Sequence, residues 1–295
     1  MTLTPLTRRA LAAALEVAAR NGLRCDDPQI LRDASNLLVL LRPAPVVARI
    51  TTVTSTERHG DAWLAREVAM ARHLVAAGAP VVAPSDEIAP GPHHHDGLVL
   101  SFWTYVDEAD RPLDAHEAGR RLRICHDALA SFDGADLPRL AVIDEADRVL
   151  ESLAGAGMLD DDDAALLRRA GADVRARIEA LALPMQAVHG DAHLHNVING
   201  PDGPLWNDFE DCFCGPRAWD LGCLHATALV LGRDPAPVAA AQAGYGPALH
   251  DDMLGVFLDA RRYQGTVWSA VMAREQPGAF TDRTYALLGW YRERR

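Results

Sequence analysis

The chain has 295 residues, of which 49% are hydrophobic and 24% charged, so it suits a folded protein of two domains or one bilobal unit and excludes a disordered chain. Its formal net charge is −12, with 41 acidic against 29 basic residues, which argues against a nucleic-acid partner because such proteins carry a basic face. No uncharged apolar run approaches the roughly 20 residues that span a bilayer, and five cysteines without framework spacing suit a reducing cytoplasm, so we expect a cytoplasmic protein with no membrane partner.

The first 106 residues have the pattern of a small α+β lobe. A leading helix is favoured by Pro5, which suits a first helical position, and by Gly22 as a stop. Hydrophobic runs and spacing then predict two strands, a helix and a third strand. The elements predicted in this lobe are 5–20, 36–41, 46–50, 61–77 and 98–106.

The remaining residues, 107–295, are expected to be mostly helical. Helices are predicted over 116–129, 144–153, 160–183, 219–231, 247–273 and 282–292. Short strands are predicted over 186–188, 197–199 and 205–206. The sequence therefore predicts an α+β protein whose lobes are residues 1–106 and 107–295.

The most informative stretch lies between two of these short strands. Residues 189–196 read His-Gly-Asp-Ala-His-Leu-His-Asn, and residues 207–210 read Asn-Asp-Phe-Glu. Asp191 and Asn196 can flank one loop, while Asp208 returns on the far arm of the following turn. One carboxylate can then accept a hydroxyl proton, while an amide oxygen and a second carboxylate hold Mg²⁺ against phosphates.

These residues resemble the aminoglycoside phosphotransferase and choline-kinase-like family. The resemblance runs through His-Gly-Asp-x-x-x-x-Asn, then Asp-Phe-Glu in place of Asp-Phe-Gly, then Gly-Pro-x-x-Trp-Asp-Leu at 215–221. It implies a bilobal protein-kinase-like fold, with a small antiparallel-sheet N-lobe that has one main helix and a larger helical C-lobe. It also implies a Mg²⁺-dependent kinase that transfers the γ-phosphoryl group of ATP or GTP to a small-molecule hydroxyl.

The resemblance assigns roles to five residues of the second lobe and its loop. Asp191 would be the catalytic base or hydroxyl-orienting residue. Asn196 and Asp208 would be the metal ligands. Asp220 would accept hydrogen bonds from the catalytic-loop backbone, and His189 would brace that loop.

In the first lobe the resemblance is weaker, but its parts come in the expected order. Ser35 and Asn36 would form the phosphate-covering turn, without the G-x-G-x-x-G of protein kinases. Arg49 stands where kinases have a lysine, so a planar bidentate fork replaces a point charge. Glu67 would be its helix partner. A hinge would hydrogen-bond the nucleotide base through Phe102, Trp103 and Thr104.

Several alternatives remain open at this point. The cluster His189, Asp191 and His193 could serve a zinc-dependent hydrolase, because alternating His and Asp can ligate Zn²⁺. A non-catalytic nucleotide-binding pseudokinase is a second alternative. A further cluster, Cys212, Cys214, Cys223 and His225, is either a zinc site or a group of buried thiols.

Other features have structural interpretations beside functional ones. The run 93–95 of three histidines is expected at an exposed loop tip, with metal binding as the alternative. The acidic run 160–163 is expected at a helix start, where the macrodipole favours it, with contact to a cationic substrate as the alternative. C-terminal aromatic residues are expected in the core or in a wall for an organic cation: Tyr245, Tyr263, Trp268 and Trp290. The acceptor, an aminoglycoside or another amino-alcohol or sugar, and the oligomeric state are left open.

Overall fold

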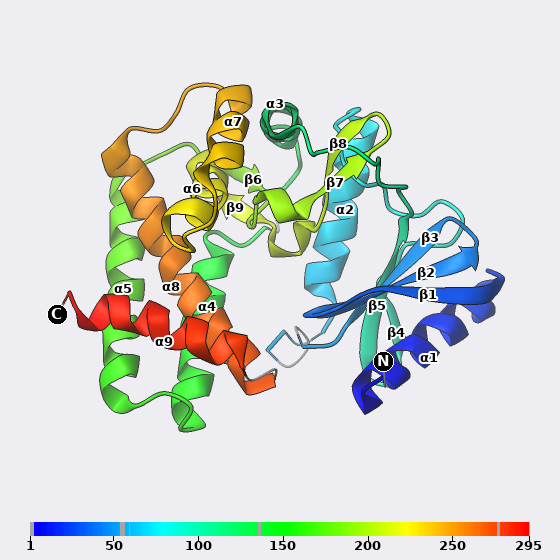
Figure 1. The fold of residues 1–295 in the computed structure, drawn as a ribbon, viewed down its shortest axis with the longest axis horizontal. Coiled ribbons are helices and arrows are strands. Elements are labelled where there is room, and N and C mark those ends of the chain that lie inside the picture. Colours follow the sequence, from blue (N-terminus) through cyan, green and yellow to red (C-terminus); the bar gives the residue numbers. More distant parts are fainter. Residues whose placement is uncertain (1–2, 54–56, 59, 135–136, 276–277, 295) are drawn as a thin grey trace. The chain divides into compact units, whose positions relative to one another are not determined.

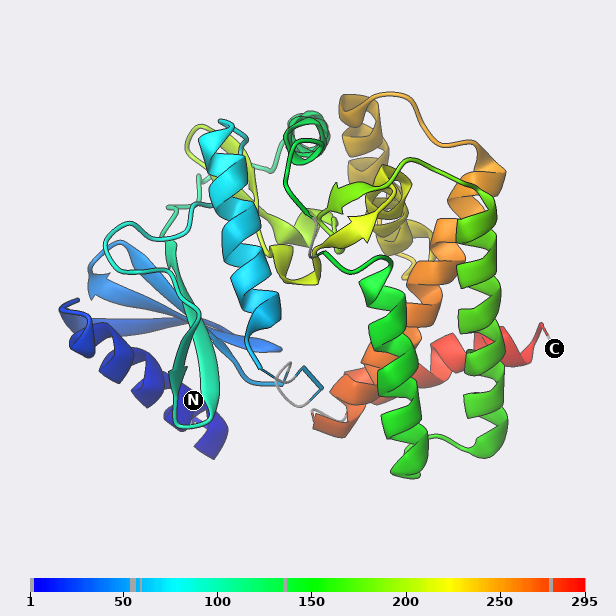
Figure 2. The same cartoon turned by 180° about the vertical axis from the view of Figure 1, so that it is seen from behind.

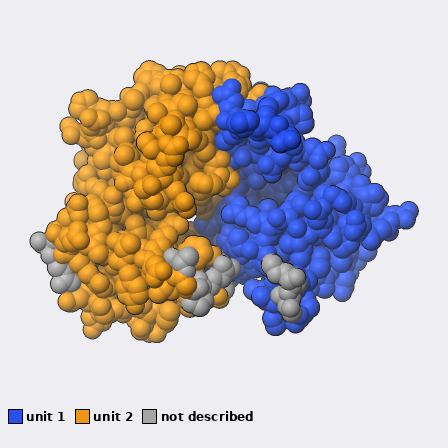
Figure 3. All heavy atoms as spheres, in the orientation of Figure 1, with its two compact units in different colours: residues 1–114, 197–210 blue, residues 115–196, 211–295 orange. Residues whose placement is uncertain are grey.

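The structure is a computed structural model that describes residues 3–53, 57–58, 60–134, 137–275 and 278–294. The chain forms two compact units: Met1–Asp114 with Val197–Glu210, and Ala115–Asn196 with Asp211–Arg295 (Figure 3). We call them unit 1 and unit 2. The lobe boundary after residue 106, predicted where the sequence pattern becomes mainly helical, stays a prediction. By contacts, residues 107–114 and the excursion 197–210 belong with the first unit.

Unit 1 contains a five-stranded antiparallel sheet with the strand order β1-β2-β3-β5-β4 (Figures 1 and 2). Its strands are β1 (Cys25–Asp33), β2 (Asn36–Pro43), β3 (Val46–Thr51), β4 (His93–His95) and β5 (Leu98–Thr104). Strand β1 lies at one edge and is mostly exposed, and it carries Pro28 and two register shifts. These are features of an edge strand, and they explain why its polar sequence gave no strand signal.

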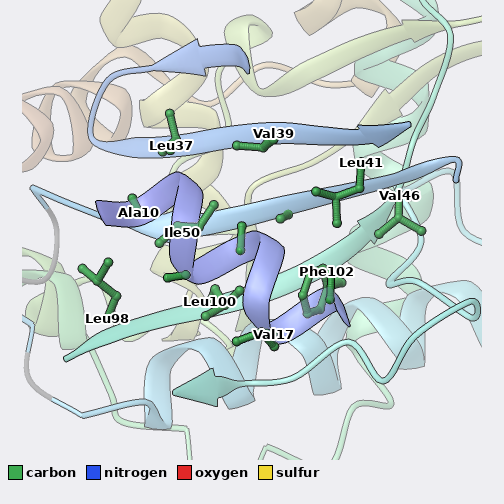
Figure 4. Packing of buried hydrophobic residues seen from close by; sticks show 14 of the residues in the cluster. Ala10, Val17, Leu37, Val39, Leu41, Val46, Ile50, Leu98, Leu100 and Phe102 are labelled. Carbon is green, nitrogen blue, oxygen red and sulfur yellow. The ribbon is translucent and has the colours of Figure 1, made fainter. Parts of the chain in front are cut away.

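One face of this sheet packs on helix α1 (Pro5–Arg20), which has the bounds predicted from the sequence. Thr4 caps the helix by accepting from the Thr7 amide at 3.0 Å. Alternate residues of the strands, among them Val39, Ile50 and Phe102, point into a core shared with this helix (Figure 4). The period of two along each strand therefore places the intervening residues on the opposite face.

Helix α2 (Ala62–Ala76) lies on the opposite face of the sheet. Val68 and Ala71 of this helix pack against Trp103 and Val82. The hairpin of β7 (Val197–Gly200) and β8 (Gly203–Trp206) packs against the same cluster, and Trp206 pairs with the segment at Val81. Residues 197–210 consequently belong to unit 1, although they interrupt the sequence of unit 2.

Unit 2 is mainly helical and carries one small antiparallel sheet. Its helices are α3 (Ala115–Leu129), α4 (Ala141–Gly155), α5 (Asp161–Ala180), α6 (Arg217–Leu229), α7 (Pro235–Tyr245), α8 (Asp251–Glu275) and α9 (Ala279–Arg292). The sheet pairs β6 (Gln186–Val188) with β9 (Phe213–Gly215), and single 3-10 turns lie at Leu194–Asn196 and Phe209–Asp211, the second spanning the unit boundary. Helices α3 and α7 cross closely, since a Cβ on Gly119 would lie 1.7 Å from the Ala241 carbonyl oxygen.

The expected α+β architecture, an antiparallel-sheet region followed by a helical region, is confirmed. The acidic run at 160–163 does begin a helix, since Asp160 caps α5 by accepting from the Asp163 amide at 2.7 Å. Two expectations are wrong. The histidine run 93–95 is a strand paired with β5, and an unpredicted helix, α7, precedes α8. Within the described residues, no helix is long and apolar enough to cross a membrane.

Candidate active site

A buried arginine forms the centre of the candidate site residues in unit 1. Arg49 lies on β3 between Ala48 and Ile50, which point into the α1 core, so its own side chain lies on the α2 face. There Arg49 Nη1 donates to Glu67 Oε1 of α2 at 2.6 Å. Only 6% of the arginine side chain and 1% of the glutamate side chain are exposed. The pair expected from the sequence is therefore present.

Two more carboxylates, from residues after strand β8, meet the same guanidinium. Arg49 Nη2 lies 2.8 Å from Asp208 Oδ1 and donates a short hydrogen bond to Glu210 Oε2. The Asp208 oxygen is buried yet accepts no hydrogen bond within the described chain, and the residue has a left-handed φ of 68°. Asp is one of the few residue types that tolerate this conformation. Arg58 lies 3.9 Å from Glu210, so three acids share two cations.

The protonation equilibria of this cluster follow from burial and close charge. Burial opposes the charge of Arg49, but the carboxylates of Asp208, Glu210 and Glu67 outweigh it and raise the pKa of Arg49 above its ordinary value. Burial raises the pKa of Glu67 to about 7, although the Arg49 charge and hydrogen bond lower it. Arg49 therefore stays charged, and its buried helix partner titrates near neutrality.

The turn predicted to cover phosphates joins β1 to β2. The Ser35 carbonyl accepts from the Val53 amide at 3.0 Å and from Thr52 Oγ1 at 2.9 Å. With its amide oxygen turned toward Arg49, Asn36 accepts from Nη2 at 3.0 Å. The turn, the arginine and the following acids thus form one connected group in unit 1.

The predicted hinge residues lie on β5 with several backbone donors already used. Phe102 N–H donates to the Pro90 carbonyl and Thr104 N–H to the Ala83 carbonyl, both at 2.9 Å. The Phe102 side chain is buried in the α1 core, whereas Trp103 packs near α2. The amides of Phe102 and Thr104 already donate to protein carbonyls, so they are not free to donate to a nucleotide base. Base recognition through Phe102, Trp103 and Thr104 stays a prediction.

In unit 2, a buried aspartate on α6 holds the catalytic loop predicted from the motif. Asp220 accepts from the His189 amide at 2.8 Å and from the Gly190 amide at 2.9 Å. Its Oδ2 also meets His126 Nε2 at 2.8 Å, and the other nitrogen of that ring meets the Tyr245 hydroxyl at 2.8 Å. All of this network is buried. The loop-bracing contacts expected for Asp220 are present.

Burial would raise the pKa of Asp220, but the hydrogen bond and charge of His126, the charge of His189 and the Gly190 amide lower it below its ordinary value. Asp220 is therefore held as a carboxylate, able to accept from several donors at once. The glycine in the loop is required sterically. Gly190 has a φ of +89°, and a Cβ there would lie 2.0 Å from the Asp211 carbonyl oxygen.

Asp191 itself is surrounded by donors from its own loop and from α8. The Asn196 side-chain nitrogen donates to the Asp191 carbonyl at 2.9 Å and lies 3.4 Å from Oδ2. His193 Nε2 lies 3.3 Å from the same Oδ2. The other oxygen, Oδ1, accepts from Arg261 Nη2 at 2.5 Å.

These neighbours determine the ionisation of Asp191. Burial alone would raise its pKa, but the charge of His193, the charge of Arg261 and the charge of His189 lower it well below the usual range. Asp191 is therefore a carboxylate at any physiological pH. Its loop position and its charge suit a group that accepts a hydrogen bond from a hydroxyl.

Two residues that the sequence analysis did not single out contribute to the site. Arg261 contacts Asp191 from 70 positions further along the chain, and His126 contacts Asp220 from 94 positions before it. Contacts between residues so far apart in the chain leave no local pattern in the sequence. An arginine on an amphipathic helix, like a histidine on another, is more commonly a surface or core residue.

The zinc alternatives gain no support from the side-chain arrangement. Across the described residues, no three His, Cys, Asp or Glu side chains gather as a metal-binding group. Cys223 is buried with a pKa raised well above its ordinary value, and Cys212 is also buried and forms no disulfide within the described residues. The aromatic wall expected for an organic cation is already occupied at Trp290 by the protein's own arginines. The guanidinium carbons of Arg262 and Arg294 lie 3.9 Å and 4.3 Å from its ring centroid.

Comparisons with known proteins gave a match to one family model and to solved structures. The model of a family described as the phosphotransferase enzyme family matches residues 27–255. No curated protein matches the sequence significantly. Among solved structures, an amicoumacin kinase, hAmiN, in complex with AMP-PNP, Ca²⁺ and Ami is similar with a TM-score of 0.74 and 14% identity, covering 95% of this chain and 93% of that one.

Two further structures show the same fold. A choline/ethanolamine kinase family protein from Mesorhizobium loti gives a TM-score of 0.64 at 19% identity, covering 97% of this chain and 92% of that one. The choline kinase LicA from Streptococcus pneumoniae gives a TM-score of 0.67 at 14% identity, with coverages of 96% and 97%. At these identities the likeness establishes a shared kinase-like fold, and the substrates stay those of the relatives.

Proposed function

This chain belongs to the phosphotransferase enzyme family, and we propose that it is a Mg²⁺-dependent kinase transferring the γ-phosphoryl group of ATP or GTP to a hydroxyl of a small molecule. The observation that carries the proposal is the convergence of Glu67, Asp208 and Glu210 on Arg49. A buried cation fixed by a helix glutamate and bordered by acids suits the phosphates of a nucleoside triphosphate and its divalent cation. The family membership and the loop that contains Asp191 support the same function.

The unit 1 residues fit a metal–nucleotide complex. Carboxylate and amide oxygens are the ligands that Mg²⁺ prefers, and when bound the ion would neutralise charge on the phosphates. Asp208 Oδ1 is buried, lies 2.8 Å from Arg49 Nη2 and accepts no hydrogen bond in the described chain, and it would be a ligand for the ion. Arg49 would grip the phosphates while Glu67 fixes its rotamer, and Ser35 with Asn36 would cover them from the turn.

Asn196 is proposed as the second metal ligand because of its orientation and its place in the chain. Its amide nitrogen donates to the Asp191 carbonyl, which leaves Oδ1 as the oxygen for a cation. It directly precedes Val197, which pairs in register with Trp206, and Asp208 follows two residues after that partner. The covalent chain thus keeps Asn196 and Asp208 near the same end of one hairpin.

Asp191 is proposed to orient the acceptor hydroxyl and to take its proton. Because its pKa lies well below the usual range, it is a weak base, so the proton would move late, as the new phosphorus–oxygen bond forms. Catalysis then depends mainly on positioning and on charge neutralisation. His189 and Asp220 hold the backbone that presents this carboxylate.

The acceptor is proposed only as a class, a small molecule with a hydroxyl group such as an aminoglycoside, another amino-alcohol or a sugar. The solved relatives include kinases named for amicoumacin and for choline, which shows that this fold serves different acceptors. The zinc-hydrolase alternative is not retained, because the chain belongs to a phosphotransferase family. The pseudokinase alternative conflicts with the presence of Asp191, Asn196 and Asp208.

A hydroxyl-compound panel tests the proposal. The protein would be incubated with Mg²⁺, each nucleotide and each candidate acceptor, with nucleoside diphosphate release measured and the products identified by ³¹P NMR. We expect acceptor-dependent diphosphate release and a new phosphomonoester signal, both lost on EDTA addition. Zinc found stoichiometrically in the purified protein, with hydrolysis and no phosphomonoester, would contradict the proposal.

A further inference from the structure

Arg261 of α8 is the one described side chain from outside the catalytic loop that binds the Asp191 carboxylate. It donates to Oδ1, while His193 and Asn196 lie against Oδ2. The two carboxylate oxygens therefore face different partners, a helix arginine on one side and the loop's own residues on the other. Asp191 therefore has one partner that is distant in the sequence, Arg261, and two partners from its own loop, His193 and Asn196.

The arginine is itself fixed in place. Its side chain is 15% exposed, and Nη1 donates a short hydrogen bond to Gln264 one turn further along α8. Its Nε is buried without a hydrogen-bond acceptor within the described residues. A buried guanidinium with an unsatisfied N–H contributes little to stability, because the cost of removing its charge from water opposes the gain from ion pairing. Its position is better explained by its contact with Asp191.

The charge of Arg261 differs in kind from that of the other neighbours. A guanidinium keeps its charge at every pH used for an enzyme, whereas His193 and His189 are charged only when protonated. Other groups near Arg261 are Asp211, Arg283 on α9 and the Cys223 thiol on α6, whose raised pKa leaves it uncharged. Arg261 is thus the permanent cation in direct contact with Asp191.

We propose that Arg261 is a positioning residue for phosphoryl transfer, which fixes the orientation of the Asp191 carboxylate. This inference rests on the proposed kinase function. In the transfer step, the bond from the acceptor oxygen to phosphorus forms as the bond to the nucleoside diphosphate breaks. The hydroxyl proton passes to Asp191, and Arg261 holds that carboxylate in line.

The first experiment measures the surroundings of the Asp191 carboxylate without using activity. The carboxyl carbons are labelled with ¹³C, and the Asp191 signal is assigned by its loss in Asp191→Asn and compared between variants at one pH by NMR. Arg261→Met removes the donor to Oδ1, so this signal should shift. Arg262→Met, on the same helix but stacked on Trp290, is the matched control.

The second experiment measures the rate. We expect Arg261→Met to lower kcat about 100-fold, the loss typical of a misplaced reacting group, with the KM of nucleotide and acceptor nearly unchanged. Arg261→Lys should recover part of the rate, because it restores the charge without the planar fork. In an Asp191→Asn background, Arg261→Met should have little further effect, because its target is already gone.

Each outcome separates this inference from the proposed function. An Asp191 signal in Arg261→Met at the same position as in Arg262→Met would overturn the inference whether or not the protein is a kinase. A rise in acceptor KM with unchanged kcat would overturn it by making Arg261 a substrate-binding residue. If the wild-type protein transfers no phosphoryl group, the proposed function fails while the NMR comparison still decides whether Arg261 holds the Asp191 carboxylate. Circular dichroism of each variant confirms that folded proteins are compared.

Discussion

Replacing Asp220 by Asn should destabilise the protein far more than the loss of a single surface charge. The carboxylate accepts from two backbone amides, those of His189 and Gly190, and contacts His126 Nε2, all within 2.9 Å and fully buried. An Asn side chain has one oxygen, so at least one of these donors loses its acceptor and faces an NH₂ group. A buried unsatisfied donor costs about 1–3 kcal/mol, and losing the charge weakens the remaining bonds. We therefore expect Asp220→Asn to lower the free energy of unfolding by roughly 3 kcal/mol.

Urea denaturation followed by circular dichroism gives the measurement, with the midpoint lowered and the slope unchanged. The matched control is Asp127→Asn, an acid that is 56% exposed and paired with Arg217 at 2.7 Å. An exposed pair of this kind contributes about 0–1 kcal/mol, so the control should be nearly neutral. The reasoning would be refuted if the two variants unfolded at the same urea concentration.

Three further predictions concern other parts of the site. Arg49→Met should weaken nucleotide binding at least about 10-fold in calorimetry, since charge-assisted hydrogen bonds contribute about 1.5–3 kcal/mol each; unchanged affinity would exclude a phosphate contact. Gly190→Ala should destabilise the protein more than Gly97→Ala. Both glycines have a positive φ, but only at Gly190 would a Cβ lie 2.0 Å from a carbonyl oxygen. Equal denaturation midpoints of the two variants would contradict this. The pKa of Glu67 is about 7 in the folded protein, against an ordinary value of 4.5. Between these two values the folded state binds more protons than the unfolded state. The free energy of unfolding should therefore fall by roughly 3 kcal/mol as pH rises through that window. Glu67→Gln should flatten that pH dependence, and an identical profile would show that the group is not perturbed.

Features set by neighbouring residues could be predicted from the sequence. Helix 5–20 was readable from its starting proline, its period and its stop, and the structure gives it the same bounds. The loop at 189–196 could be singled out as a candidate catalytic loop because its residues are contiguous. The Arg49–Glu67 pair followed from family resemblance, and strand periodicity explains it, since alternation along β3 turns that arginine toward α2.

Features set by distant contacts could not be predicted. Strand β1 is polar and interrupted by Pro28, so only its pairing with β2 makes it a strand. The histidines at 93–95 likewise became a strand through pairing with β5. Arg261 and His126 reach the site across 70 and 94 residues, and the periodicity of a helix says which face is apolar but not what each polar residue will meet.

The most direct test of the account is the turnover of Asp191→Asn with Mg²⁺, nucleotide and the best acceptor from the panel, measured beside the wild-type protein. The variant keeps the size of the side chain and removes the group that orients the hydroxyl and takes its proton. General-base and orienting roles together predict a loss in kcat of about 100- to 10,000-fold, with nucleotide affinity and the fold retained. A variant that turns over within a few-fold of the wild-type rate would contradict the central claim that this carboxylate carries the transfer.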